Sequence, residues 1–217
     1  IEQLPRVYRF HQKYSYDWQN WLPFFWQGYR QTTRYTYVLP ELDDLDAVYQ
    51  EFKKNTRYDI RKASKKVDVI DSDDIEAFIR LNTLTFSRQN SKASYSDELV
   101  RRLNQACTER NCRKMLFARD ESGNLHGAVY LVWDERRVYY ILSGSDPDYR
   151  QSKANSLLIW KAIQFTAAKG KVFDFEGSMI EPIERFFRSF GARQMPYFSI
   201  YKNKFPFNII DLLRSGL

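Results

Sequence analysis

The stretch KVFDFEGS, residues 171–178, joins an extended, apolar pattern to two carboxylates. Alternation along a strand places Asp174 and Glu176 on one face and the two phenylalanines on the other. Burying two unpaired acids in so apolar a segment is costly. We therefore expect the carboxylates either to face a cleft or to form a structural ion pair with a cation such as Arg185 or Arg188.

The segments on either side of this stretch alternate between helical and extended patterns. Apolar residues recur at helical spacing after Asp71-Ser72 and after Ser94 or Ser96, and again over about 152–169 and 181–190. Extended patterns occupy residues 67–70, 114–119, 126–133, 137–143, 171–176 and 196–202. The order is strand, two helices, three antiparallel strands, helix, strand, helix, strand. It predicts an α+β fold with a mixed, mostly antiparallel sheet and helices on both faces.

Residues 1–66 differ in character from this series. They predict strands at 6–13 and 33–39, separated by an aromatic loop at 18–26. The loop suits a hydrophobic plug against the next domain, and the alternative is a wall of an acceptor pocket that includes Trp26. We expect residues 1–66 to form a partial N-terminal subdomain and residues 67–217 a complete domain.

A helix starting near Asp43 runs into a densely cationic segment, residues 53–66. Such a run is usually a solvated helical face, and here the alternative is a surface that grips phosphate, with Arg61 among its cations. The formal net charge of +7 favours anionic partners such as a phosphorylated cofactor, RNA or a lipid-linked pyrophosphate precursor.

The composition excludes several classes of protein. Hydrophobic residues make up 43% of the 217 residues, which argues against disorder. Two cysteines and two histidines provide no metal-ligand cluster. Neither a long apolar run nor a signal peptide is visible, which predicts a cytoplasmic protein. The chain begins with Ile1, and we expect that N-terminal residues are missing.

Two stretches carry a family resemblance. The sequence FDFEGS at 173–178, followed by FRSFG at 187–191, resembles the Asp-x-x-Gly … Phe-Lys-x-x-Phe-Gly signature of Fem-type transferases. These are relatives of the GNAT acyltransferases that attach amino acids to peptidoglycan precursors. The basic segment RYDIRKASK at 57–65 is also similar to a Fem-type segment. The resemblance implies a GNAT-like domain of the Fem-like or polysaccharide-associated branch, with residues 1–66 similar to the tail of a first half.

One stretch departs from the ordinary GNAT pattern. GNAT enzymes hold the pyrophosphate of coenzyme A on a loop of the form Arg/Gln-x-x-Gly-x-Gly/Ala at a helix start. The equivalent stretch here is RQSKAN at 150–155, in which Lys153 and Asn155 replace small residues. The lysine can still pair with phosphate. Fem-type enzymes, which use aminoacyl-tRNA, also lack this loop.

The resemblance assigns roles to individual residues. Acyl transfer to an amine needs a base, a donor to the oxyanion and aligned substrates. Glu176 is favoured as the general base, with Asp174 beside it, and Tyr140 is a candidate to return a proton to the leaving group, although packing is the alternative for it. Donor-binding candidates are Leu142, Ser143, Gly144, Arg150, Lys153 and Asn155. Acceptor-binding candidates are Ser178, Arg188, Trp26 and Arg61.

Three functions remain open at this point. The first is an N-acyltransferase that moves an acyl group from acyl-coenzyme A to an amine of a cell-surface or polysaccharide precursor. The second is an aminoacyl-tRNA-dependent transferase, whose tRNA would bind the basic segment. The third is a catalytically silent GNAT fold that binds a ligand. A small-molecule or lipid-linked amine is the expected acceptor, which leaves peripheral membrane contact open; DNA is not an expected partner.

Overall fold

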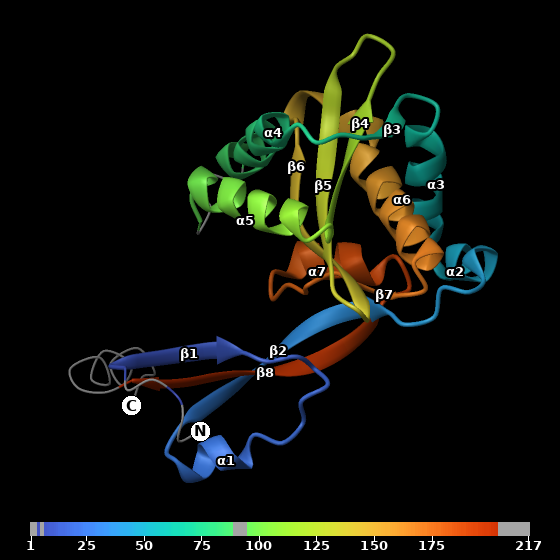
Figure 1. Ribbon diagram of the computed structural model, residues 1–217. Helices are drawn as coiled ribbons and strands as arrows, with labels where there is room; N and C mark the ends of the chain where they lie inside the picture. Colours follow the sequence, from blue (N-terminus) through green and yellow to red (C-terminus); the bar gives the residue numbers. More distant parts are fainter. Residues whose placement is uncertain (1–3, 5–6, 89–94, 204–217) are drawn as a thin grey trace.

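The computed structural model describes residues 4, 7–88 and 95–203, and a single sheet of eight strands runs through them (Figure 1). The strands are β1 Arg9–Lys13, β2 Arg30–Leu39, β3 Asp68–Asp71, β4 Arg113–Arg119, β5 Leu125–Trp133, β6 Arg137–Ser145, β7 Val172–Asp174 and β8 Arg193–Asn203. The helices are α1 Leu22–Trp26, α2 Leu45–Glu51, α3 Lys54–Ala63, α4 Ile75–Arg88, α5 Asp97–Glu109, the 3-10 helix η1 Pro147–Ser152, α6 Ala154–Ala168 and α7 Glu181–Arg188.

The strand order is β1-β8-β2-β7-β6-β5-β4-β3. Every neighbouring pair is antiparallel except β6 and β7, which run parallel. The α+β class and the mixed, mostly antiparallel sheet are thereby confirmed. In Figure 1, β1, β2 and β8 form a long arm that projects away from the helix-covered part of the sheet.

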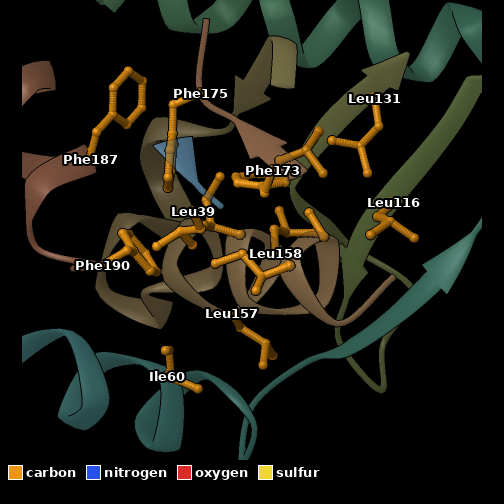
Figure 2. Packing of buried hydrophobic residues seen from close by; sticks show 14 of the residues in the cluster. Leu39, Ile60, Leu116, Leu131, Leu157, Leu158, Phe173, Phe175, Phe187 and Phe190 are labelled. Atoms are coloured by element: carbon orange, nitrogen blue, oxygen red, sulfur yellow. The ribbon is translucent and has the colours of Figure 1, made fainter. Parts of the chain in front are cut away.

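Helices cover both faces of the sheet (Figure 1). On one face, α6 is buried along most of its length and packs with α3 against β4, β5 and β7 (Figure 2). On the other face, α4 and α5 pack around Phe78 and Val100 against Met115, Phe117 and Tyr130. Both sides thus bury apolar surface, which is the main favourable contribution to folding. No helix in the described ranges is long and apolar enough to cross a membrane.

The expected helices match the observed ones closely where local signals mark their ends. Ser96 caps α5, because its hydroxyl accepts a hydrogen bond from the Leu99 backbone N–H at 3.2 Å. It is one of the two expected caps, and the other, Ser94, lies outside the described residues. The helix expected from residue 152 instead begins at Ala154, because η1 occupies the preceding turn. Within the aromatic loop expected at 18–26, residues 22–26 form the short helix α1.

The strand expected over residues 171–176 ends at Asp174. Glu176 and Gly177 both have left-handed backbone conformations, with φ of +59° and +71°, which no strand accommodates. Glu176 therefore lies beyond the strand, and the expectation that strand alternation places it on the same face as Asp174 is wrong.

The expected division at residue 66 stays a prediction. Strands β1 and β2 come from the expected N-terminal subdomain, yet they pair with β7 and β8 of the following segment in one sheet.

Candidate active site

The sheet opens between β6 and β7. The two strands pair only from Arg137 to Tyr139, so beyond Tyr139 this edge of β6 has no strand beside it among the described elements. A bulge lies just past the same point: Tyr130 of β5 pairs with Leu142 and Leu131 with Tyr140, which leaves Ile141 as an extra residue. Bulges bend a strand and re-aim its side chains. The opening therefore exposes main chain and side chains of β6 from Tyr140 onward.

The segment after β7 is held against β2 by a close backbone approach. The Phe175 N–H donates to the Tyr37 carbonyl at 2.9 Å. A Cβ atom on Gly177 would lie 2.1 Å from the Tyr35 carbonyl oxygen, so only glycine fits. Glu176 pays a conformational cost of about 1 kcal/mol for its left-handed backbone, a kind of strain that clusters at functional sites.

A large cleft of about 720 Å³ occupies the opening. Its walls include the open edge of β6, part of α4, η1 with the start of α6, and the segment from Phe175 to Phe187. Eight of the candidate residues line it: Tyr140, Leu142, Ser143, Arg150, Lys153, Asn155, Glu176 and Ser178. The cleft has the size of a typical small-molecule site.

A second, smaller cleft of about 290 Å³ lies where the arm meets the open strands. It is lined by Lys13, Tyr14, Ser15, Tyr16, Thr36, Arg137, Tyr139, Asp174, Glu176 and Tyr197. Glu176 is the one described residue that lines both clefts. Glu176 thus borders two cavities.

Asp174 is buried and only partly satisfied. Its Oδ1 atom accepts hydrogen bonds from the Thr36 hydroxyl at 2.5 Å and from the Glu176 N–H at 2.8 Å. The side chain is 4% exposed, and burial is the main cause that raises its pKa; the Thr36 hydrogen bond acts in the opposite direction.

The Glu176 side chain is exposed to solvent, although nearby protein partly desolvates its carboxylate. Its carboxylate accepts no hydrogen bond from any residue in the described ranges. Desolvation raises its pKa first and the negative charge of Asp174 adds to this, while the positive charge of Lys13 opposes it. A carboxylate with a raised pKa is suited to accept a proton near neutral pH.

Tyr140 faces the large cleft between aromatic neighbours. Its ring meets those of Phe175 and Phe187 edge to face, at centroid distances of 6.4 and 6.0 Å. Burial raises its pKa to about 12, although a hydrogen bond with Ser143 acts in the opposite direction. The phenol consequently keeps its proton at neutral pH and can donate it.

The start of α6 forms the cationic end of the large cleft. Lys153 precedes the helix with a φ of +65°, where glycine is the usual residue, and no side chain caps the helix at this position. Its ammonium group lies 3.8 Å from the Asp59 carboxylate, which also lines the cleft. Arg150 is exposed beside it. Two cations and the positive end of a helix dipole favour an anion here, and Asp59 limits this preference.

Four candidate residues lie outside both clefts. Gly144 packs against α4, because a Cβ there would lie 2.4 Å from the Asn82 backbone nitrogen. Arg188 forms an ion pair with Glu184 on the exposed side of α7 and does not pair with Asp174 or Glu176. Trp26 is the last residue of α1, with 70% of its surface exposed. Arg61 is exposed on α3.

Several residues that line the clefts were not predicted from the sequence, because they lie in segments far from the motifs. Arg137, only 8% exposed, forms an ion pair with Asp17 and donates to the Tyr16 hydroxyl at 2.8 Å, which ties the N-terminal segment to β6. Thr36 and Lys13 also line the small cleft. No spacing or motif marks these positions. The described part of the chain contains no group of three or more His, Cys, Asp or Glu residues suited to a metal ion.

Comparison with known proteins gives the same fold. FemX matches with a TM-score of 0.67 and 13% identity over 76% of this chain and 61% of FemX. L-PGS from Bacillus licheniformis matches with a TM-score of 0.58 and 10% identity over 89% of this chain and 68% of its own. A tandem GNAT protein from the clavulanic acid biosynthesis pathway matches with a TM-score of 0.52 and 9% identity over 82% and 55%.

The chain spans less than two thirds of the length of FemX and of the tandem GNAT protein. None of the curated protein sequences matches it. A family model described as an acetyltransferase (GNAT) domain matches residues 50–188, which is more than half of the chain. With the split between β6 and β7 and the FemX-like fold, this match shows that the chain belongs to the GNAT acyltransferase family, with a Fem-like resemblance.

Proposed function

We propose that this chain is an N-acyltransferase in which Glu176 deprotonates an amine acceptor beside a donor bound in the large cleft. The observation that carries the proposal is the position of Glu176, which lines both clefts at the point where β6 and β7 separate. A base in that position reaches an acceptor from one cavity and a donor from the other. Its raised pKa and its lack of a described hydrogen-bond partner support the same role.

The reaction follows from the groups present. Glu176 takes a proton from the acceptor ammonium, and the freed nitrogen lone pair attacks the acyl carbonyl carbon. The carbonyl oxygen becomes an oxyanion, for which main-chain N–H groups on the open edge of β6 are the donors we propose. When the tetrahedral intermediate collapses, the bond to the carrier breaks and Tyr140 gives its proton to the leaving atom. The attacking nitrogen then loses its second proton, which restores the Tyr140 phenol and leaves a neutral amide. The Glu176 proton then returns to solvent.

The cationic end of the large cleft supports an anionic carrier such as coenzyme A. Acyl-coenzyme A supplies its acyl group as a thioester. Arg150, Lys153 and the N-terminal amides of α6 would hold its phosphates, while Leu142, Ser143 and Asn155 line the path between that end and Glu176. We propose an amine on a cell-surface or polysaccharide precursor as the acceptor, with Ser178 beside it.

One observation favours aminoacyl-tRNA as an alternative donor. Helix α3 carries exposed cations, among them Lys54 and Arg61, and its Asp59 contacts Lys153 at the start of α6, so a helix surface with exposed cations borders the large cleft. A nucleic acid that reached the cleft with its 3′ end would gain affinity from such a surface.

The first experiment compares donors by stabilisation. A ligand that binds only the folded state raises the melting temperature. Acetyl-coenzyme A is titrated against desulfo-coenzyme A and against charged and uncharged tRNA. A shift with acetyl-coenzyme A supports the first donor, and preference for charged over uncharged tRNA supports the second. Absence of any shift, together with no acyl transfer to a panel of amines, would indicate a catalytically silent fold.

A second experiment tests the base. Glu176→Gln keeps the size of the side chain and removes its charge, so we expect turnover to fall about 100-fold with the fold intact. Glu121→Gln, in an exposed turn distant from both clefts, is the matched control. Equal activity of the two variants would remove Glu176 from the mechanism.

A further inference from the structure

The small cleft has an unusual balance of charges. Of its two cations, Arg137 is neutralised by Asp17, with which it forms an ion pair. The other, Lys13, is exposed and forms no ion pair within 4 Å with a described residue. The two acids of the cleft, Asp174 and Glu176, likewise have no cation within that distance in the described ranges. The cleft thus presents an unpaired carboxylate pair and an unpaired ammonium group.

The carboxylate pair is poised for a cation. Asp174 is 4% exposed, and both of its described hydrogen bonds go to Oδ1, which leaves Oδ2 without a partner in this part of the structure. Desolvation raises the pKa of both carboxyl groups, and the negative charge of Asp174 raises the pKa of Glu176 further. An ammonium group between the two carboxylates would screen their repulsion, and its hydrogen bonds would replace the water that each carboxylate has lost. A neutral or anionic ligand would do neither.

Lys13 lines the same cleft as the two carboxylates. It is close enough to Glu176 to lower the pKa of that carboxyl, yet it does not contact it as an ion pair. Four of the other residues that line the cleft are aromatic: Tyr14, Tyr16, Tyr139 and Tyr197. These rings provide apolar surface for a short aliphatic spacer. The volume of about 290 Å³ is at the lower limit for a small-molecule site, which restricts the ligand to a small molecule or the end of a larger one.

We propose that the small cleft is the acceptor subsite and that it selects a zwitterionic acceptor. The primary ammonium lies between Asp174 and Glu176, and an anionic group of the same molecule pairs with Lys13. This inference rests on the proposed function, because it places the reactive amine next to the base. It narrows the acceptor class from any amine to a small amine that also carries a carboxylate or a similar anion.

The experiment measures binding without any acyl donor. The probes are ω-amino acids with two to six carbons, from glycine through γ-aminobutyrate to 6-aminohexanoate, compared with butylamine and butyrate. We expect at least one ω-amino acid to bind about tenfold more tightly than butylamine, as expected for one additional charge-assisted contact, and butyrate to bind weakest. Isothermal titration calorimetry gives these affinities. If no ω-amino acid binds more tightly than butylamine, the proposal is wrong.

Two variants assign the contacts. Lys13→Gln should remove the advantage of the ω-amino acid over butylamine, whereas Lys161→Gln, which changes an exposed lysine outside both clefts, should keep that advantage. Asp174→Asn should weaken both amines. Because Lys13 is exposed, its variant keeps the fold, which circular dichroism verifies. An equal effect of Lys13→Gln and Lys161→Gln would overturn the assignment.

The two proposals fail in different ways. If ω-amino acids bind in a Lys13-dependent manner but are not acylated with any donor, the acyltransferase function fails and the zwitterion subsite stands. If amines are acylated at rates that depend neither on an anionic group nor on Lys13, the function stands and the zwitterion subsite is refuted.

Discussion

Replacing Gly177 by alanine would place a methyl carbon 2.1 Å from the Tyr35 carbonyl oxygen and 2.8 Å from the Thr36 Cα atom. Both neighbours are backbone atoms of β2, so no side-chain rotation relieves the overlap. The segment after β7 must move away from β2 by about 1 Å to restore an ordinary contact. That movement breaks the hydrogen bond from Phe175 to Tyr37 and displaces Glu176 from its place between the clefts.

The magnitude has two parts. A left-handed residue other than glycine costs about 1–2 kcal/mol, and overpacking adds about 1–3 kcal/mol. Gly170→Ala is the matched control, because Gly170 has a φ of +61°, close to the +71° of Gly177, but nothing lies within 4 Å of its added Cβ. We therefore expect Gly177→Ala to destabilise the fold by about 2–5 kcal/mol and Gly170→Ala by about 1–2 kcal/mol.

Urea denaturation followed by tryptophan fluorescence measures both stabilities, and ligand titration below the transition measures the integrity of the clefts. Gly177→Ala should lose ligand binding in addition to stability, whereas Gly170→Ala should lose only stability. Equal losses in the two variants would show that the close approach to β2 does not position the site.

The other predictions concern the ionised groups. Because the pKa of Glu176 is raised, kcat/KM should fall as pH decreases, with a midpoint above the ordinary glutamate pKa of 4.5. This acidic limb should be absent in Glu176→Gln. A limb at the same pH in the variant would exclude Glu176 as the base. The raised pKa of Asp174 means that the folded protein binds this proton more tightly than the unfolded chain, so stability is highest below the ordinary aspartate pKa and decreases as pH rises through the folded value. Denaturation of Asp174→Asn across pH 3–8 should show that decrease reduced, and an unchanged pH dependence would contradict the reasoning. Asp17→Asn should destabilise the protein by about 1–2 kcal/mol, because it leaves the buried Arg137 guanidinium without its carboxylate. The cost is modest because Asp17 is partly exposed. An unchanged melting temperature would mean that water replaces the Asp17 carboxylate.

Much of the fold could be predicted because its signals are local. The helical spacing of Ile75, Phe78 and Ile79 and the cap at Ser96 act within one or two turns, so α4 and α5 were found near their true starts. The order of the elements then restricted the topology to a mixed sheet with helices on both faces. The signatures at 173–178 and 187–191 indicated the family, which the family model confirms.

The site could be predicted only in part. Glu176, Tyr140 and the start of α6 were named from motif positions, and all of them line the large cleft. Trp26, Arg61 and Arg188 were chosen by residue type near a motif or a charge run, and the fold places them outside both clefts. The bulge at Ile141, which helps to open the sheet, follows from pairing with β5 and has no signal in its own sequence.

The sequence by itself indicated a short strand at the start of the stretch 171–178, with two carboxylates and a glycine close to its end, because extended patterns and residue type are properties of neighbouring residues. Only the tertiary structure decided where those carboxylates lie. The turn at Glu176 and Gly177 exists because β2, more than a hundred residues earlier in the chain, packs too closely for any side chain at Gly177. The small cleft also contains Thr36, Lys13 and Arg137, which reach it through strand pairing between segments distant in the sequence. Contacts of that kind leave no periodicity in the sequence.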